Sequence, residues 1–295
     1  RSGGGMKAAP FEYCPVGSVE EAVALLAEDE GAKVLAGGQS LVPLMAMRLA
    51  RPRRLVDLNL VPGLDGVRVE GDRLSLGAMV RHRQVERQAE LRRRCPLIGE
   101  VVEQIGHVAI RNRGTVGGSL AHADPAAEWP ALALALEAEL VVEGGSGRRI
   151  VPAGEFFTGV FETVLRQDEV LTEVRFGLPS EGAGAAVLEL SRRQGDFAIV
   201  GVVAVLEPDG EGVVREARLA LFGVGETAVR ARAAEARLIG ERPDERVIAG
   251  VVEAVGSELR PTGDLQGSAE YRRHLAGVLT RRALVQAWQR AGRGA

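Results

Sequence analysis

The chain has 295 residues, of which 46% are apolar and 26% are charged, and its formal net charge is −3. This composition is typical of a globular protein with two or three domains, and the acidic balance argues against a binder of nucleic acid or anionic membranes. No run reaches the roughly 18 apolar residues of a membrane span, and no signal peptide is visible, so we expect a cytoplasmic protein with no membrane span.

The N-terminal part of the chain predicts a small βαβ unit. The residues RSGGG before Met6 resemble a cloning remnant and are left out of the fold prediction. Ser18 is expected to cap a first helix together with Glu21, and Ser40 to cap a second helix in SLVPLMAMRLA. Short strands are expected at residues 33–36 and 54–58.

The middle of the chain predicts hairpins and helices in alternation. A helix is expected to begin in DPAAEWPALALALEAEL, with Asp124 as the N-cap and Pro125 at the first helical position. The other expected elements are a hairpin at 66–79, helices at about 81–90 and 97–107, and a hairpin around Gly144 and Gly145.

A segment rich in glycine and alanine, residues 177–186, predicts a domain boundary. Beyond it the pattern indicates strands first and helices after them, which is typical of a separate α+β domain. The strands are expected at about 186–193, 198–207 and 215–222, and the helices at about 227–239, 244–257 and 268–291. The predicted structural units are therefore residues 6–60, 61–178 and 183–291.

Two glycine pairs, Gly37–Gly38 and Gly117–Gly118, recur 80 residues apart. Backbone N–H groups in such loops can reach pyrophosphate oxygens because no side chain blocks the approach, and the hydroxyls of Ser40, Thr115 and Ser119 can donate further hydrogen bonds. Neither stretch matches GxGxxG or GxxxxGK[ST], and a single pair is commonly just a turn. The residues alone indicate a dinucleotide-type ligand without identifying it.

The two cysteines do not add a metal site to this prediction. Cys14 and Cys95 lie far apart without CxxC or Cys/His spacing, so we expect free thiols and no zinc or iron–sulfur site held by this chain alone. A flavin in such a protein would have to receive its electrons from elsewhere.

Six separated segments resemble, in order, the FAD-binding medium subunits of the molybdenum hydroxylases, the family of xanthine dehydrogenase and aerobic carbon monoxide dehydrogenase. The likeness covers Met6 to about Ala287. The segments are FEY (11–13), AGGQSLVPLMAMR (36–48), VDL (56–58), RNRGTVGGSLAHADPAAEWP (111–130), SRRQGDFAIVG (191–201) and YRRHLAGVLTRRAL (271–284).

The resemblance implies an α+β fold with a p-cresol methylhydroxylase-type FAD-binding domain in two α/β subdomains. A C-terminal domain with an antiparallel sheet and helices would follow. The resemblance places residues 36–40 and 115–119 at the FAD pyrophosphate, Glu128 near the ribityl chain, Ile105 beside the adenine and Phe197 near the isoalloxazine. The residues implied for FAD are Ala36, Gly37, Gly38, Gln39, Ser40, Leu41, Ile105, Thr115, Val116, Gly117, Gly118, Ser119, Asp124, Glu128, Leu171 and Phe197.

Two positions depart from the family pattern. Phe197 stands where carbon monoxide dehydrogenases carry tyrosine, which removes a hydroxyl from the flavin surroundings. Leu188 stands near the position where xanthine dehydrogenases carry lysine, which weakens the prediction of an NAD-type acceptor. Leu171 is expected as an apolar contact of the flavin.

Other polar residues leave alternatives open. Asp124 and Glu128 could form an acid–base pair, or Asp124 could serve only as a helix cap. His107 and His122, which flank the second glycine pair, could contact the flavin or be structural. The segments 48–54 and 81–94 are rich in arginine and could bind nucleic acid, but they are more typical of solvated helix faces or subunit contacts. Arg192 and Arg193 could meet a partner or the flavin phosphates. No residue is assigned a catalytic or metal-binding role.

The sequence thus predicts the FAD-binding electron-transfer subunit of a molybdenum hydroxylase. The expected partners are a large molybdopterin subunit and a small 2Fe–2S subunit, assembled as a dimer of heterotrimers. One alternative is a self-sufficient FAD-dependent oxidase or dehydrogenase of a small organic substrate. Another is a scaffold subunit that has lost its cofactor.

Overall fold

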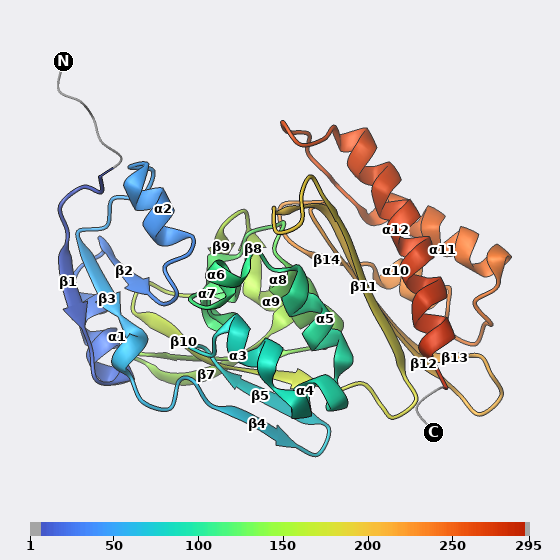
Figure 1. Ribbon diagram of the computed structural model, residues 1–295, viewed down its shortest axis with the longest axis horizontal. Coiled ribbons are helices and arrows are strands. Elements are labelled where there is room, and N and C mark those ends of the chain that lie inside the picture. The colour runs from blue at the N-terminus through green and yellow to red at the C-terminus, as the bar shows by residue number, and fades with distance from the viewer. Residues whose placement is uncertain (1–6, 293–295) are drawn as a thin grey trace.

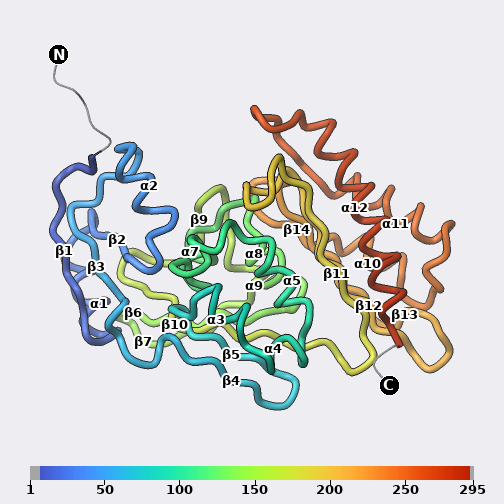
Figure 2. The backbone as a smooth tube through the Cα atoms, viewed as in Figure 1, coloured from blue at the N-terminus to red at the C-terminus, as the bar shows by residue number. Residues whose placement is uncertain are grey.

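The computed structural model describes residues 7–292, so the expected start at Met6 and the RSGGG segment lie outside the described residues. Of the four sheets in the described residues, the three larger ones follow one another along the longest axis of the molecule (Figures 1 and 2). Helices lie beside each of these three sheets (Figure 1).

The N-terminal unit is a parallel three-stranded sheet in the order β1-β3-β2, as the predicted βαβ pattern requires. Its elements are β1 (Glu12–Pro15), α1 (Val19–Glu28), β2 (Ala32–Leu35), α2 (Leu41–Ala46), β3 (Arg54–Asp57) and the 3-10 helix η1 (Leu58–Leu60). Because parallel strands end at the same edge of a sheet, the loop after β2 lies beside the residues that follow β3.

The two helix caps predicted in this unit have different outcomes. The hydroxyl of Ser18 accepts a hydrogen bond of 3.1 Å from the backbone N–H of Glu21, which confirms it as an N-cap. Ser40 directly precedes α2, but its hydroxyl makes no capping bond, so that prediction is wrong. The reason is the backbone of Ser40, which is already helical (φ −104°, ψ −50°) where a capping residue is usually extended.

The middle unit is a five-stranded antiparallel sheet in the order β4-β5-β10-β6-β7. Both predicted hairpins are confirmed as β4–β5 and β6–β7. The strands are β4 (Val67–Glu70), β5 (Arg73–Gly77), β6 (Glu139–Gly144), β7 (Gly147–Pro152) and β10 (Glu169–Gly177), and a small hairpin of β8 (Phe157–Gly159) and β9 (Glu162–Thr163) lies apart from this sheet. The helices are α3 (His82–Arg87), α4 (Ala89–Arg94), α5 (Pro96–Gln104), α6 (Val108–Arg111), α7 (Val116–His122), α8 (Glu128–Ala135) and α9 (Ala153–Phe156).

Two helices of the middle unit differ from their predicted bounds. The helix expected at 81–90 is split into α3 and α4, which allows Val85 and Leu91 both to be buried although a continuous helix would point them in different directions. The helix expected at 97–107 is α5, and it ends early because Gly106 has a positive φ of 49°.

The helix predicted to begin at Asp124 begins instead at Glu128, with Ala127 as its N-cap. Asp124 still accepts a backbone hydrogen bond, from the N–H of Ala126 at 2.9 Å, but within a turn that precedes the helix. Pro130 explains the later start, because a proline in the interior of a helix removes a hydrogen bond and clashes with the preceding turn. In α8 as observed, Pro130 falls in the first turn, where neither problem arises.

The C-terminal unit is an antiparallel four-stranded sheet in the order β11-β12-β13-β14, with helices on one face (Figure 1). The predicted helix from residue 227 is wrong at its start, because Val229 and Arg230 first pair with Leu221 and Ala220 as an edge strand. The elements are β11 (Gly184–Ser191), β12 (Ala198–Pro208), β13 (Val214–Phe222), β14 (Val229–Arg230), α10 (Arg232–Ala236), α11 (Glu245–Glu258) and α12 (Ala269–Arg290).

The two faces of the C-terminal sheet belong to different cores. One face packs with α11 and α12, through residues such as Val202 and Leu284. The opposite face, which includes Val203 and Phe222, joins the apolar core of the middle unit around Trp129. The C-terminal sheet is therefore fixed against α8 of the middle unit, and loops from both units meet above this shared core. The arrangement confirms the expected α+β class.

Candidate functional site

The two glycine segments lie in contact with each other. We call residues 36–40, between β2 and α2, loop 1, and residues 112–119, which connect α6 to α7 and include its first turn, loop 2. A Cβ atom on Gly37 would lie 2.4 Å from the backbone oxygen of Arg113 and 2.7 Å from the Cα of Gly114. Glycine at position 37 is therefore required by the packing of one loop on the other. Glycine is favoured at position 38 for a different reason. Its φ of +72° lies in the left-handed region, which residues with a side chain rarely adopt.

The glycines of loop 2 permit close packing on the β5–α3 connection. A Cβ on Gly117 would lie 2.4 Å from the Cβ of Ala78, and one on Gly114 would lie 2.7 Å from the imidazole ring of His82. The backbone of loop 2 is held at the same places, because the N–H of Gly117 donates to the oxygen of Ala78 at 2.9 Å and the N–H of His82 donates to the oxygen of Gly114 at 3.1 Å. Loop 2 is thus a rigid support.

The two loops differ in the hydrogen-bonding capacity that they leave free. In loop 1, the four consecutive backbone N–H groups of residues 37–40 donate to no other atom of the described chain. In loop 2, the N–H groups of residues 116–119 are all engaged, that of Gly118 with the hydroxyl of Thr115 at 3.0 Å. Thr115 itself is almost fully buried. The free backbone donors for an anion are therefore concentrated in loop 1.

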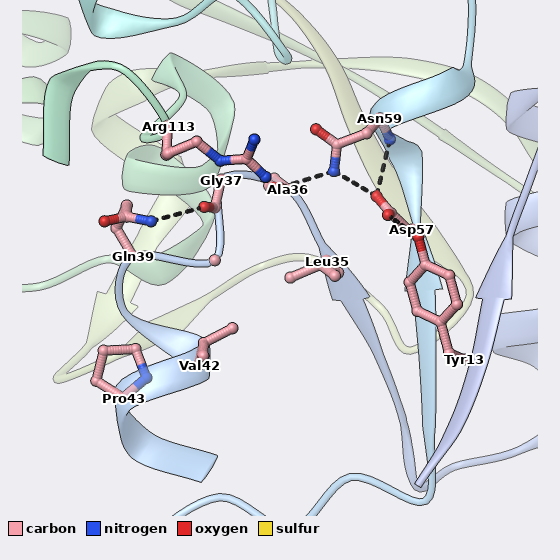
Figure 3. Close-up of a pocket in the computed structure, with 11 residues that line it drawn as sticks. Tyr13, Leu35, Ala36, Gly37, Gln39, Val42, Pro43, Asp57, Asn59 and Arg113 are labelled. Atoms are coloured by element: carbon pink, nitrogen blue, oxygen red, sulfur yellow. Dashed lines mark hydrogen bonds between the residues drawn. The ribbon is translucent and has the colours of Figure 1, made fainter. Parts of the chain in front are cut away.

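A pocket of about 490 Å³ opens beside loop 1 (Figure 3). Its polar wall is a hydrogen-bonded group in which the Tyr13 hydroxyl donates to Oδ2 of Asp57 at 2.6 Å and the Asn59 N–H donates to Oδ1 of Asp57 at 2.9 Å. The guanidinium of Arg113 lies above loop 1 at the edge of this pocket (Figure 3). The pocket thus combines free amides, a cation and a buried carboxylate.

The four polar residues of this pocket, Tyr13, Asp57, Asn59 and Arg113, were not among the residues predicted to bind the ligand. Tyr13 and Asp57 belong to the segments FEY and VDL, which carried the family resemblance but suggested no role. The hydrogen bond to Asp57 and its negative charge raise the pKa of Tyr13, so this hydroxyl remains a proton donor at neutral pH.

A second polar group lies on the other side of loop 2, between α8 and the C-terminal sheet. Glu128 is 7% exposed, and burial together with the negative charge of Glu189 raises its pKa to about 8. Burial also raises the pKa of Glu189 to about 7, and its Oε2 atom is buried without a hydrogen-bond partner. Two carboxyl groups that form no ion pair within residues 7–292 therefore lie close together at this boundary.

Glu189 was missed by sequence reasoning, which singled out its neighbour Leu188. Leu188 packs on the helix-covered face of the C-terminal sheet, against the core of α11 and α12. Because side chains alternate along a strand, Glu189 points to the opposite face, the one that Val187 shares with the middle unit. The available signal was a single carboxylate within the apolar strand AAVLELS.

The remaining predicted residues lie around this second group. Ile105 is the half-buried C-cap residue that follows α5. Two residues further on, the ring of His107 lies 2.7 Å from where a Cβ of Gly195 would be. Ile105 is thus beside the β11–β12 loop, where Phe197 is 55% exposed, and it does not line the pocket at loop 1. Leu171 lies in the core of the middle unit and is 5% exposed, which leaves little surface for a ligand contact.

His122 and Phe161 complete this side of the site. Their rings stack with centroids 4.9 Å apart, and the N–H of Phe161 donates to the oxygen of Ala123 at 3.2 Å. Phe161 is 56% exposed, so a large apolar ring faces solvent beside His122.

These features fit an extended ligand with an anionic centre. Loop 1 offers amides and a guanidinium to a diphosphate, and the buried Glu128 carboxyl offers oxygens to hydroxyl groups. An FAD molecule has both kinds of group, so the residues present fit this cofactor. Within residues 7–292, no group of three His, Cys, Asp or Glu side chains is arranged to hold a metal ion. No helix in the same part of the chain is long and apolar enough to cross a membrane.

Comparison with known proteins agrees with this geometry. Residues 9–179 match the model of the FAD-binding domain in molybdopterin dehydrogenase, and residues 185–287 match the CO dehydrogenase flavoprotein C-terminal domain. The carbon monoxide dehydrogenase medium chain of Hydrogenophaga pseudoflava is 40% identical over 281 residues, which cover 95% of this chain and 98% of that one. Caffeine dehydrogenase subunit beta of Pseudomonas sp. strain CBB1 is 40% identical over 97% of both chains.

The fold is similar to a solved structure over almost its whole length. A chain of the H. pseudoflava carbon monoxide dehydrogenase that lacks the molybdenum–pyranopterin moiety of its cofactor superposes with a TM-score of 0.94 at 41% sequence identity. The match covers 96% of this chain and 99% of that chain. This likeness confirms the predicted combination of an FAD-binding domain with a C-terminal sheet-and-helix domain.

Proposed function

Because this chain belongs to the family of FAD-binding subunits of molybdopterin dehydrogenases, we propose that it is the electron-transfer flavoprotein subunit of a molybdenum hydroxylase. In this role it receives electrons from an iron–sulfur subunit and delivers them to an external acceptor. The single observation that best supports cofactor binding is the row of four free backbone N–H groups in loop 1, next to the guanidinium of Arg113.

Each part of the site then has a binding task. The N–H groups of residues 37–40 bind the diphosphate, while loop 2 supports loop 1 from behind. The Glu128 carboxyl accepts or donates hydrogen bonds at the ribityl hydroxyls. Ile105 provides apolar surface beside the adenine, and Phe197 lies near the isoalloxazine, as the family resemblance implies. Bound FAD supplies the redox chemistry, which the side chains of this protein do not provide themselves.

The partners follow from the same family. We propose that a large subunit holds the molybdenum cofactor, that a small subunit holds 2Fe–2S clusters, and that the assembly is a dimer of heterotrimers. Relatives named for carbon monoxide and for caffeine are equally similar to this chain, at 40% identity. This equality supports a division of labour in which another subunit chooses the substrate. A cytoplasmic location stays a prediction.

The proposal is tested by the absorption spectrum of the purified chain, alone and with its partner subunits, before and after incubation with FAD. We expect about one FAD per wild-type chain. Gly118→Asp is expected to abolish binding, because the added side chain would lie 2.6 Å from the Thr115 hydroxyl and would bring a negative charge to the diphosphate site. Gly154→Asp is the matched control, since nothing lies within 4 Å of a Cβ at this position. Full flavin retention by Gly118→Asp would contradict the assignment, and a flavin-free complex would favour a scaffold.

A further inference from the structure

Arg81 lies between the two loops, although nothing in the sequence distinguishes it from its neighbours. Its Nη1 donates to the backbone oxygen of Arg113 in loop 2, and its Nη2 donates to Oδ1 of Asn59, which follows β3. These partners are 32 and 22 residues away along the chain. One guanidinium therefore joins the middle unit to the N-terminal unit at the site.

Asn59 extends this connection to loop 1. Its Nδ2 donates to the backbone oxygen of Ala36, the first residue of loop 1, at 3.1 Å. Asp57 fixes Asn59 in turn, because Oδ1 of Asp57 accepts the Asn59 N–H at 2.9 Å. The path from loop 2 to loop 1 thus runs through the Arg113 oxygen, the guanidinium of Arg81, the Asn59 amide and the Ala36 oxygen, with a hydrogen bond at each step.

The Arg113 oxygen is the point at which the loops touch, since a Cβ on Gly37 would lie 2.4 Å from it. A carbonyl oxygen directed at the loop that binds an anion carries an unfavourable partial negative charge there. The hydrogen bond from Arg81 offsets this charge and holds the carbonyl in place. The free N–H groups of residues 37–40 then remain the groups that face a diphosphate.

Arg81 has no directly paired carboxylate within the described chain, although the nearby Asp57 acts on it as a counter-charge. Its two hydrogen-bond acceptors are uncharged, and it forms no ion pair among residues 7–292, whereas the nearby Arg111 pairs with Glu86 at 3.0 Å. Arg113 likewise forms no ion pair in this part of the chain. Burial and the positive charge of Arg113 lower the pKa of Arg81, and the negative charge of Asp57 only partly opposes them, so the free chain holds two cations close together at a cost. A bound dianion would relieve that cost.

We propose that Arg81 is a positioning residue for the cofactor, which fastens loop 2 to loop 1 through Asn59 and supplies a counter-charge to the diphosphate. This inference rests on the proposed function as an FAD-binding subunit. The chemical class that it selects is a dinucleotide or nucleoside with a diphosphate, because a neutral ligand would add no negative charge beside the two guanidinium groups.

The test measures the dissociation constant for FAD and for ADP with the full chain, or with its complex if the chain alone takes up no FAD. Arg81→Met removes both charge and bridge and is expected to weaken the binding of both ligands by at least about tenfold. Arg81→Lys keeps the charge but cannot reach both acceptors, so it should recover part of the loss. The matched control is Arg149→Met. Arg149 lies on β7, away from both loops, and this substitution removes its hydrogen bonds to the Glu169 carboxylate and to the backbone oxygen of Val164. We expect it to lower the unfolding temperature while changing the dissociation constant by less than about twofold.

A double-variant cycle separates positioning from general stability. If Arg81 acts through Asn59, the pair Arg81→Met and Asn59→Ala should weaken FAD binding by less than the product of their separate effects. Wild-type affinity in Arg81→Met, or an equal loss in Arg149→Met, would overturn the inference while leaving the proposed function intact. A wild-type protein that binds neither FAD nor ADP, alone or with its partners, would overturn both.

Discussion

Gly37 of loop 1 and Arg113 of loop 2 are in backbone contact, and a Cβ on Gly37 would come within 2.4 Å of the Arg113 oxygen. The sequence predicted that both glycine segments bind the diphosphate of one ligand. In the structure they differ in their free donors, because the N–H groups of residues 37–40 in loop 1 have no acceptor in the described chain, whereas those of residues 116–119 in loop 2 are all hydrogen-bonded. Glycine at position 37 thus allows the two loops to touch. This contact in turn fixes the positions of the free N–H groups of loop 1.

Replacing Gly37 by alanine is expected to weaken FAD binding by at least about tenfold, because loop 1 must move away from the Arg113 oxygen and cannot keep its donor row in place. Gly154→Ala, at a position with nothing within 4 Å of a Cβ, is the control and should bind as wild type. Flavin titration of the two variants checks this. Equal affinity in both would show that the loop contact does not shape the site.

His82 and Trp129 form a buried pair behind loop 2. The indole N–H donates to Nδ1 of His82 at 3.1 Å, and burial lowers the pKa of His82 to about 3, with Arg111 and Arg81 contributing. The ring is therefore neutral when folded. His82→Leu leaves the indole N–H without an acceptor and is expected to lower the free energy of unfolding by about 2 kcal/mol. The His82→Leu/Trp129→Phe double variant should lose less than the sum of the single losses, which urea unfolding would reveal.

Burial of His82 also makes the stability of the folded chain fall at acidic pH. In the unfolded chain His82 binds a proton below about pH 6.5, whereas the folded chain does so only near pH 3. The unfolded state therefore binds more protons between these values, and the contribution of His82 to stability is lost as the pH falls through this range. His82→Leu should remove this part of the acid sensitivity; an unchanged slope between pH 6 and pH 4 would argue against it.

The close packing around Gly184 predicts that a substitution there affects stability, away from the proposed cofactor site. A Cβ at this position would lie 1.8 Å from the oxygen of Ala287 and 2.5 Å from the nitrogen of Ala291, both at the end of α12. Gly184→Ala should push β11 and α12 apart and cost about 3 kcal/mol in urea unfolding. Gly210→Ala, with nothing near its Cβ, should be within about 0.5 kcal/mol of wild type. Equal stability of the two variants would contradict the observed packing.

Elements governed by local signals could be predicted from the sequence. The Ser18 cap and both hairpins of the middle unit depend on residues only a few positions apart. The start of α8 could not be read in the same way, because Asp124 followed by Pro125 suits a turn as well as a helix start, and the decision depends on Pro130 further on. Likewise Val229 and Arg230 become an edge strand only because β13 offers them a partner.

The candidate site was predictable only where glycine marks the backbone. Loops 1 and 2 follow from their glycine pairs, but Arg81, Asn59 and Glu189 acquire their roles from contacts with distant parts of the chain. Arg81 stands in a segment with many arginines, and its sequence neighbours do not distinguish it from a surface residue. Its function depends on the carbonyl of Arg113, 32 residues later, which only the fold brings within reach.

The buried carboxyl of Glu128 makes the stability of the folded chain depend on pH. Burial, and then the charges of Glu189 and Asp124, raise its pKa to about 8, while its own backbone opposes the shift slightly. In the folded chain without cofactor it is neutral at pH 7, but in the unfolded chain it ionises near pH 4.5. Unfolding therefore releases a proton, so this contribution to stability is complete below pH 4.5 and is lost as the pH rises towards 8.

Glu128→Gln removes the titrating group while keeping a similar shape, so the flavin-free variant should be more stable than wild type, by about 3 kcal/mol at pH 7. Urea unfolding between pH 5 and pH 8 measures this, and the advantage should shrink towards pH 5. FAD binding should respond in the opposite direction, because an amide replaces the carboxyl that meets the ribityl hydroxyls. A stability advantage over wild type that is no larger at pH 7 than at pH 5 would show that Glu128 ionises freely in the folded chain. A stabilised variant with undiminished FAD affinity would instead separate the buried carboxyl from the cofactor.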